Sequence, residues 1–176
     1  MNKENDIKKV IHLIAWWLSK LELNEFIDLF DLNKITEDIV LMLLNEIYGY
    51  QLVNLNHKKH NFSAIDLGDT ENGIAFQVTT RTDIYKIEKN LKTFIKEHKT
   101  DYPKGIRFLI LSMEESKIRN LKRSKRLKNI DLNFNPGKHI LSMKEIIREI
   151  ETLYVEDRER FNRVKQILEE EIAVKP

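Results

Sequence analysis

The spacing of hydrophobic residues changes along the chain from a helical period to a strand period and back. Up to about residue 48, apolar side chains recur every three or four positions, which predicts amphipathic helices. We expect one helix at 5–22, a short one from Asn24 to about Phe30, and a longer one that Gly49 ends. The amino-terminal part, about 1–48, is therefore predicted to be helical.

Between residues 50 and 80 the apolar residues form short runs that are typical of strands. The runs YQLVNLN, FSAIDLGD and GIAFQVTT are separated by HKKHN and GDTENG, whose composition is typical of turns. Three consecutive short strands predict a meander, and we expect the middle strands of the central sheet at about 62–66, 73–79 and 107–112.

Helical spacing returns at 82–98, where lysines occupy the face opposite the apolar residues. The continuous apolar run RFLILS at 107–112 predicts a strand that is buried on both faces. A short strand near 139–142 and two helices, at about 144–155 and 157–172, complete the pattern. The sequence thus predicts a single α/β domain over 1–176, with a mixed central sheet flanked by helices.

The composition fits such a domain and excludes several classes of protein. A chain of 176 residues can bury one sizeable core. The absence of cysteine excludes disulfide scaffolds, thiolate zinc sites, iron–sulfur proteins and cysteine nucleophiles, and it favours a cytoplasmic protein. No apolar run is long enough to span a membrane, so we expect no membrane partner.

Charge is distributed unevenly around a basic middle segment. Residues 1–56 carry a net charge of −4, residues 57–150 of +8 and residues 151–176 of −2. A run of cations without any acid lies at 117–128, and it is either a solvated helix face or a phosphate-binding surface. The candidates for phosphate contacts are Lys122, Arg123, Lys125 and Arg126.

Asp66 and Gln77 are the candidates for chemistry, because a hairpin between their strands would bring both side chains to one edge of the sheet. Mg²⁺ or Mn²⁺ is held by carboxylates, backbone carbonyls, waters and phosphate oxygens. Asp66, the Gln77 amide oxygen and the Val78 carbonyl would supply such ligands, and Glu46 would add a second carboxylate if its helix packs beside the strands. The alternative is that Asp66 is a turn or capping residue, as strand-end aspartates often are.

The literal sequence resembles a known family over about residues 40–112. The phrases AIDLGD and GIAFQVT within NFSAIDLGDTENGIAFQVTTRTDIYKIEKNLKTF are similar to the SMEK domain, a bacterial module whose core resembles the PD-(D/E)XK nuclease superfamily. The resemblance implies a restriction-endonuclease-like fold. It also implies that Glu46, Asp66 and Gln77 correspond to the helix glutamate, the strand-end aspartate and the first residue of the (Asp/Glu/Gln)-x-Lys triplet.

The chain departs from the superfamily at the catalytic lysine, since Thr79 stands two residues after Gln77. A lysine at this position would position the attacking water and neutralise phosphate charge, which threonine cannot do. Arg81 or Lys86 could supply the missing cation. The resemblance therefore implies a metal-dependent nuclease, or a nuclease-derived domain that binds nucleic acid, in a bacterial antiviral defence system, with DNA as the first expectation. The alternative is a non-catalytic scaffold for a partner protein or a second copy of the chain.

Overall fold

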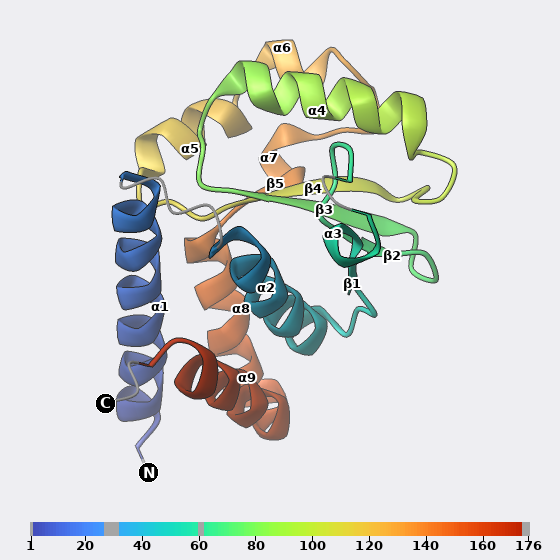
Figure 1. Ribbon diagram of the computed structural model, residues 1–176. Helices are drawn as coiled ribbons and strands as arrows, with labels where there is room; N and C mark the ends of the chain where they lie inside the picture. Colours follow the sequence, from blue (N-terminus) through green and yellow to red (C-terminus); the bar gives the residue numbers. More distant parts are fainter. Residues whose placement is uncertain (1, 27–31, 60–61, 174–176) are drawn as a thin grey trace. The chain divides into compact units, whose positions relative to one another are not determined.

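The elements form two groups in the described residues, which are 2–26, 32–59 and 62–173 of this computed structural model (Figure 1). The terminal unit consists of Met1–Gly49 together with Lys144–Pro176, and the middle unit of Tyr50–Met143. We describe each unit by itself. That the whole of 1–176 is a single domain stays a prediction.

The terminal unit is helical. Its elements are α1 (Lys3–Phe26), α2 (Leu32–Tyr48), α8 (Met143–Glu156) and α9 (Arg158–Glu171). Helix α9 contacts both α1 and α2. The apolar residues at helical spacing are buried, as Ile14, Leu44 and Phe161 illustrate. An ion pair between Lys165 Nζ and Asp6 Oδ1, at 3.0 Å, adds to the contact between α9 and α1.

The middle unit contains a five-stranded mixed sheet whose strands lie in sequence order. The strands are β1 (Val53–Asn54), β2 (Leu67–Asp69), β3 (Ile74–Thr79), β4 (Gly105–Ile110) and β5 (Ile140–Ser142). The first three strands are antiparallel neighbours, whereas β4 runs parallel to β3 and to β5. The apolar run near residue 107 is therefore an inner strand with a neighbour on each side, as its composition predicts.

Five helices of the middle unit connect these strands. They are α3 (Leu55–Lys58), α4 (Ile84–Glu97), α5 (Glu115–Lys122), α6 (Lys125–Lys128) and α7 (Pro136–His139). Helix α4 is the crossover between the parallel strands β3 and β4, and it lies over the sheet (Figure 1). Its residues Ile87, Leu91 and Phe94 belong to one buried cluster with Ala75 of β3 and Phe108 of β4. The apolar face of the predicted lysine-rich helix thus packs on the sheet.

The expected α/β class, the mixed sheet and the helical amino-terminal segment are confirmed. The predicted helix at 82–98 and the strands at 73–79, 107–112 and 139–142 agree with the structure within a few residues. In the described parts of the chain, no helix combines the length and the apolar character needed to cross a membrane.

The predicted strand at 62–66 is wrong, because β2 begins only at Leu67 and Asp66 directly precedes it. Ala64 has φ of 64°, in the left-handed region, and the Ile65 N–H donates to the Ser63 carbonyl at 2.9 Å. This local turn is incompatible with extended backbone. The preceding predicted strand is shortened to Val53–Asn54, because the Asn54 side chain caps the helical turn α3.

The short helix expected from Asn24 to about Phe30 is not found where the structure can test it. Asn24 lies inside α1, which continues to Phe26 without a break. Residues 27–31 lie outside the described residues. The first helix is thus longer than the hydrophobic spacing predicts.

The contact between β2 and the turn before β4 gives a stability prediction. A Cβ atom added at Gly68 would lie 2.3 Å from Tyr102 Oη and 2.7 Å from its Cζ, and Tyr102 is buried. We expect Gly68→Ala to lower the free energy of unfolding by about 1–3 kcal/mol, because the tyrosine has to move inside a packed core. Urea denaturation measures this loss. Gly137→Ala is the control, since its nearest new contact would be Asn135 Oδ1 at 3.3 Å; a similar loss in both variants would contradict the steric explanation.

Candidate functional site

The Asp66 carboxylate takes the place of a backbone hydrogen-bond acceptor at the end of the β2–β3 pairing. Its Oδ2 accepts a hydrogen bond from the Val78 backbone N–H at 2.8 Å, just beyond the last residue pair of β2 and β3, Leu67 with Phe76. The Asp66 backbone N–H donates to the Phe76 carbonyl, and its own carbonyl accepts from the Leu55 N–H. Backbone and side chain of Asp66 are therefore both fixed at the end of the β2–β3 ladder.

Asn56 holds the second oxygen of this carboxylate, and sequence reasoning missed it. Its Nδ2 donates to Asp66 Oδ1 at 3.1 Å, while its Oδ1 accepts from the Phe62 N–H at 2.9 Å. The helical turn α3 places Asn56 there, since the Asn54 side chain accepts from the Asn56 N–H. The repeated asparagines in NLN were the available signal, because they are typical of a capped turn rather than a strand.

Gln77 lies between the two β3 residues that bond Asp66. Side chains alternate across a strand, so Gln77 points to the same face as Ala75, which is the face covered by α4. Its Oε1 is buried and has no hydrogen-bond partner among the described residues. A buried acceptor without a donor is costly and rare in native proteins, and it indicates that a donor or a cation belongs there.

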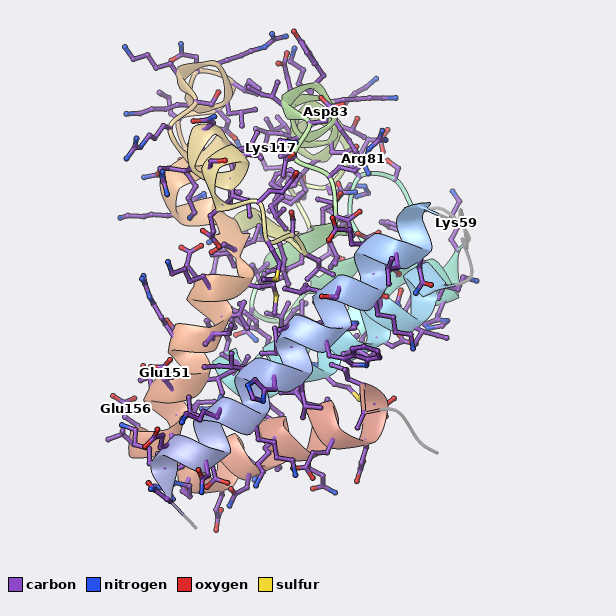
Figure 2. All side chains as sticks on the ribbon, turned by 90° about the vertical axis from the view of Figure 1, so that its left-hand side faces the viewer. Lys59, Arg81, Asp83, Lys117, Glu151 and Glu156 are labelled. Atoms are coloured by element: carbon purple, nitrogen blue, oxygen red, sulfur yellow. The ribbon has the colours of Figure 1, made fainter. Side chains whose placement is uncertain are left out.

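The two candidate cations differ in their relation to Asp66. Lys86 lies in the first turn of α4, and its positive charge acts directly on the Asp66 carboxylate. Arg81 is labelled in Figure 2 close to the start of α4, and it is exposed. Thr79 is 8% exposed, and its hydroxyl accepts from the Arg81 N–H at 3.0 Å, so it shapes the turn into α4. Lys86 is thus the candidate cation whose charge favours the ionised form of Asp66.

Burial raises the pKa of Asp66 above its ordinary value of 3.8. The hydrogen bonds from Val78 and Asn56 and the charge of Lys86 lower the pKa, and they offset only part of the effect of burial. The ionised carboxylate is therefore short of compensating positive charge. A bound cation would supply that charge.

Asp69 is a contrasting carboxylate nearby in the chain. Burial also works to raise its pKa, but hydrogen bonds from Asn72, Gln51 and Glu71 outweigh burial and lower the pKa below 3.8. Its oxygens accept from the Asn72 backbone and side chain and from the Gln51 N–H, at 2.6–2.9 Å. Asp69 is thus a satisfied turn residue, whereas Asp66 and Gln77 retain unused capacity to bind.

The residues around Asp66 fit a hard divalent cation. The N–H and C=O groups of one strand residue lie on the same side, so the Val78 carbonyl points toward the edge where its N–H meets Asp66. Carboxylate, amide and carbonyl oxygens are the ligands of Mg²⁺ and Mn²⁺. The described residues contain no group of three or more histidines or carboxylates suited to a metal, so a cation here would need oxygens from water or substrate.

Glu46, the expected second carboxylate, belongs to α2 of the terminal unit. Its Oε2 accepts from Arg163 Nε on α9 at 2.9 Å, and its backbone carbonyl accepts from Arg160 Nε at 2.8 Å. The ion pair already compensates its charge. A role for Glu46 as a metal ligand stays a prediction.

The basic run near residue 120 is divided between α5 and α6. Lys122 Nζ donates to the Gly137 carbonyl at 3.0 Å and thereby ties α5 to α7. Arg126 forms an ion pair with Glu88 of α4. The side chains of Arg123 and Lys125 are exposed. The structure therefore gives the four candidate cations different surroundings.

Comparison with known proteins identifies one family. The family model described as the SMEK domain matches residues 9–151. This match covers elements of both units, from α1 to α8. Searches of curated proteins and of solved structures found no significant match.

Proposed function

The chain belongs to the SMEK domain family, and we propose that its middle unit is a metal-dependent nuclease core whose site is formed by Asp66, Gln77 and Lys86. The sheet supports this proposal, since three antiparallel strands, a crossover helix and two parallel strands follow one another as a restriction-endonuclease-like core would have them. The substrate would be a phosphodiester of nucleic acid. Fold analogy alone does not carry a function, so the argument depends on the site.

One observation carries the proposal, the buried Gln77 Oε1 that has no hydrogen-bond partner among the described residues. Gln77 directly precedes Val78, and the Val78 N–H donates to the Asp66 carboxylate, whose pKa burial raises. Each oxygen by itself costs free energy in the folded state. A single divalent cation would compensate both. Because one carboxylate, one amide and one carbonyl leave about half of the octahedral coordination positions open, substrate phosphate and water could complete the shell.

The residues present would divide the chemistry of hydrolysis among them. Asp66 and Gln77 would hold the cation, and Asn56 would fix the orientation of the Asp66 carboxylate. When bound, the metal lowers the pKa of a coordinated water and polarises the phosphoryl oxygens. Lys86 would face the phosphate and stabilise its developing negative charge, the task that Thr79 cannot perform.

One observation favours a second function: the Thr79 hydroxyl accepts a hydrogen bond from the Arg81 N–H. Thr79 serves the turn and leaves the superfamily lysine position without a cation. If Lys86 does not replace that lysine, the middle unit would be a degenerate nuclease core that binds a partner without cleaving. Metal binding and cleavage distinguish the two functions.

Metal binding is expected to stabilise the protein. With Mn²⁺ at about ten times its dissociation constant, the free energy of unfolding should rise by about 1.4 kcal/mol. For a chain of this size, the midpoint of thermal unfolding should rise by about 3–6 °C. Gln77→Leu should abolish the shift, because it removes the amide oxygen but retains the volume of the side chain. Glu71→Gln is the matched control, since Glu71 lies in the turn between β2 and β3. A shift of equal size in wild type and Gln77→Leu would contradict the proposed ligand set.

The pH dependence of this stabilisation follows from the raised pKa of Asp66. Folding favours the protonated carboxyl, so its contribution to stability without metal is fully present below 3.8 and is lost as pH rises through the raised pKa. Metal needs the ionised form. The Mn²⁺-induced shift should therefore grow as pH rises through the raised pKa, and a shift that does not depend on pH would indicate binding elsewhere.

A further inference from the structure

Helix α4 presents a row of cations on the side away from the sheet. Tyr85, Lys89, Lys92 and Lys96 recur at helical spacing and are exposed, while Ile87, Leu91 and Phe94 are buried on the opposite side. The three lysines extend over about 10 Å of the helix axis. A nucleic-acid strand carries one negative charge per about 3.4 Å, so this row could meet more than one phosphate.

Helix α6 extends this row. Arg126 forms an ion pair with Glu88 of α4, and its guanidinium carbon lies 4.8 Å from the centre of the Tyr85 ring. These contacts place the first turn of α6 beside the first turn of α4. In Figure 2, many side chains that end in nitrogen extend from these helices. We define the basic face as these exposed residues of α4 together with the exposed cations of α6 and of the residue after α5; its members are Tyr85, Lys89, Lys92, Lys96, Arg123, Lys125, Arg126 and Lys128.

The basic face has a large excess of positive charge. Within residues 85–96 and 123–128, the only carboxylate is Glu88, which is shared by Lys92 Nζ at 2.9 Å and by Arg126. The remaining cations of the face are exposed and make no ion pair with the described residues. They are Lys89, Lys96, Arg123, Lys125 and Lys128. Such a field attracts a polyanion.

Tyr85 is the feature of the basic face that favours a single strand of nucleic acid over other polyanions. Its side chain is 65% exposed although it is a large aromatic residue, and Arg126 covers only one side of the ring. An exposed ring beside cations is the arrangement on which unpaired bases stack, while the phosphates lie on the neighbouring cations. A duplex keeps its bases stacked inside, and a polyanion without bases has no flat group to place on the ring.

We propose that the basic face binds a single strand of nucleic acid, with its phosphates on the cations of α4 and α6 and one base stacked on Tyr85. The choice of nucleic acid as the ligand rests on the proposed function. The basic face is distinct from the Asp66 site. The residues that interact with the Asp66 carboxylate are Asn56, Val78 and Lys86, and none of them is a member of the face.

The test is equilibrium binding of a fluorescently labelled single-stranded oligonucleotide in EDTA, which prevents cleavage. Tyr85→Leu should weaken binding about tenfold, whereas Tyr85→Phe should leave it unchanged because the stacking surface remains. Binding of a duplex should be insensitive to both changes. Equal affinity of wild type and Tyr85→Leu for the single strand would overturn the proposal.

Salt dependence provides the second measurement. Each phosphate contact to a single strand contributes about −0.7 to the slope of log affinity against log salt concentration. Replacing Lys89, Lys96 and Lys125 by Ala should flatten this slope by about 2. The matched control replaces Lys20, Lys34 and Lys144, which are exposed lysines of the terminal unit. The same slope in both triple variants, or no detectable binding by wild type at low salt, would also overturn the proposal.

Different results would contradict the nuclease proposal and the strand-binding proposal. If the strand binds as described but Mn²⁺ neither binds nor supports cleavage, the result contradicts the nuclease proposal and leaves the strand-binding proposal intact. If Mn²⁺ binds and cleavage occurs but Tyr85→Leu has no effect on strand affinity, the result contradicts only the proposal that the basic face binds a single strand.

Discussion

Asp66→Ala is expected to reduce Mg²⁺- or Mn²⁺-dependent cleavage of nucleic acid by a factor of about 1000 or more. The ligands proposed from the middle unit include one carboxylate, and without it the amide and carbonyl oxygens would carry no net charge to hold a cation. Loss of a catalytic metal would remove several kcal/mol of transition-state stabilisation, and each factor of ten in rate corresponds to about 1.4 kcal/mol. Cleavage of single-stranded and duplex substrates under both metals measures the effect.

The fold of this variant has to be checked, because the Asp66 carboxylate also accepts from Val78 and Asn56. Leaving these donors unbonded should cost about 1–3 kcal/mol of the free energy of unfolding each when they are buried. Asp66→Asn is the second variant, since it preserves an acceptor for Val78 while removing the charge. Full cleavage by a folded Asp66→Asn protein would remove Asp66 from the mechanism. A wild-type protein that cleaves neither DNA nor RNA with either metal would favour the binding module.

Lys86→Ala is expected to reduce cleavage by a factor of about 100, with little change in Mn²⁺ affinity. A preorganised cation near a developing phosphate charge usually contributes about this much, and it acts on the transition state rather than on the metal. The loss should therefore appear in kcat more than in KM. Lys86→Arg should retain part of the activity, because it keeps the charge.

Arg81→Ala is the matched control for Lys86→Ala. Arg81 lies between β3 and α4, whereas Lys86 lies in the first turn of α4 and its charge lowers the pKa of Asp66. We expect Arg81→Ala to change cleavage by less than about threefold, as removal of an exposed charge usually has small effects. A large loss in Arg81→Ala together with a small loss in Lys86→Ala would reverse the assignment of the cation.

The hydrophobic pattern by itself determined most of the secondary structure. Long amphipathic segments such as 82–98 and the apolar run at 107–112 have one way to bury their apolar side chains, so local periodicity fixes them. The prediction was wrong at 62–66, where the alternation resembles a strand. There Ala64 takes a positive φ and the backbone groups of Asp66 bond Phe76 and Leu55, partners that only the folded chain supplies.

For the candidate residues too, the sequence indicated one part of the site and the folded structure added the other. The sequence indicated Asp66 and Gln77, because residue type and spacing reflect which chemistry is available. The tertiary structure added Asn56 as the residue that bonds the carboxylate, and engaged Lys122 and Arg126 with Gly137 and Glu88. The choice of Lys86 over Arg81 as the cation stays a prediction.

These outcomes depend on which side chains meet across elements, whereas helical and strand periods depend only on neighbours in the chain. Sequence periodicity therefore determined the α/β class and the candidate oxygens of this protein. The burial that raises the pKa of Asp66, the unpartnered oxygen of Gln77 and the joining of α4 to α6 arise from packing between distant segments, and only the tertiary structure decided them.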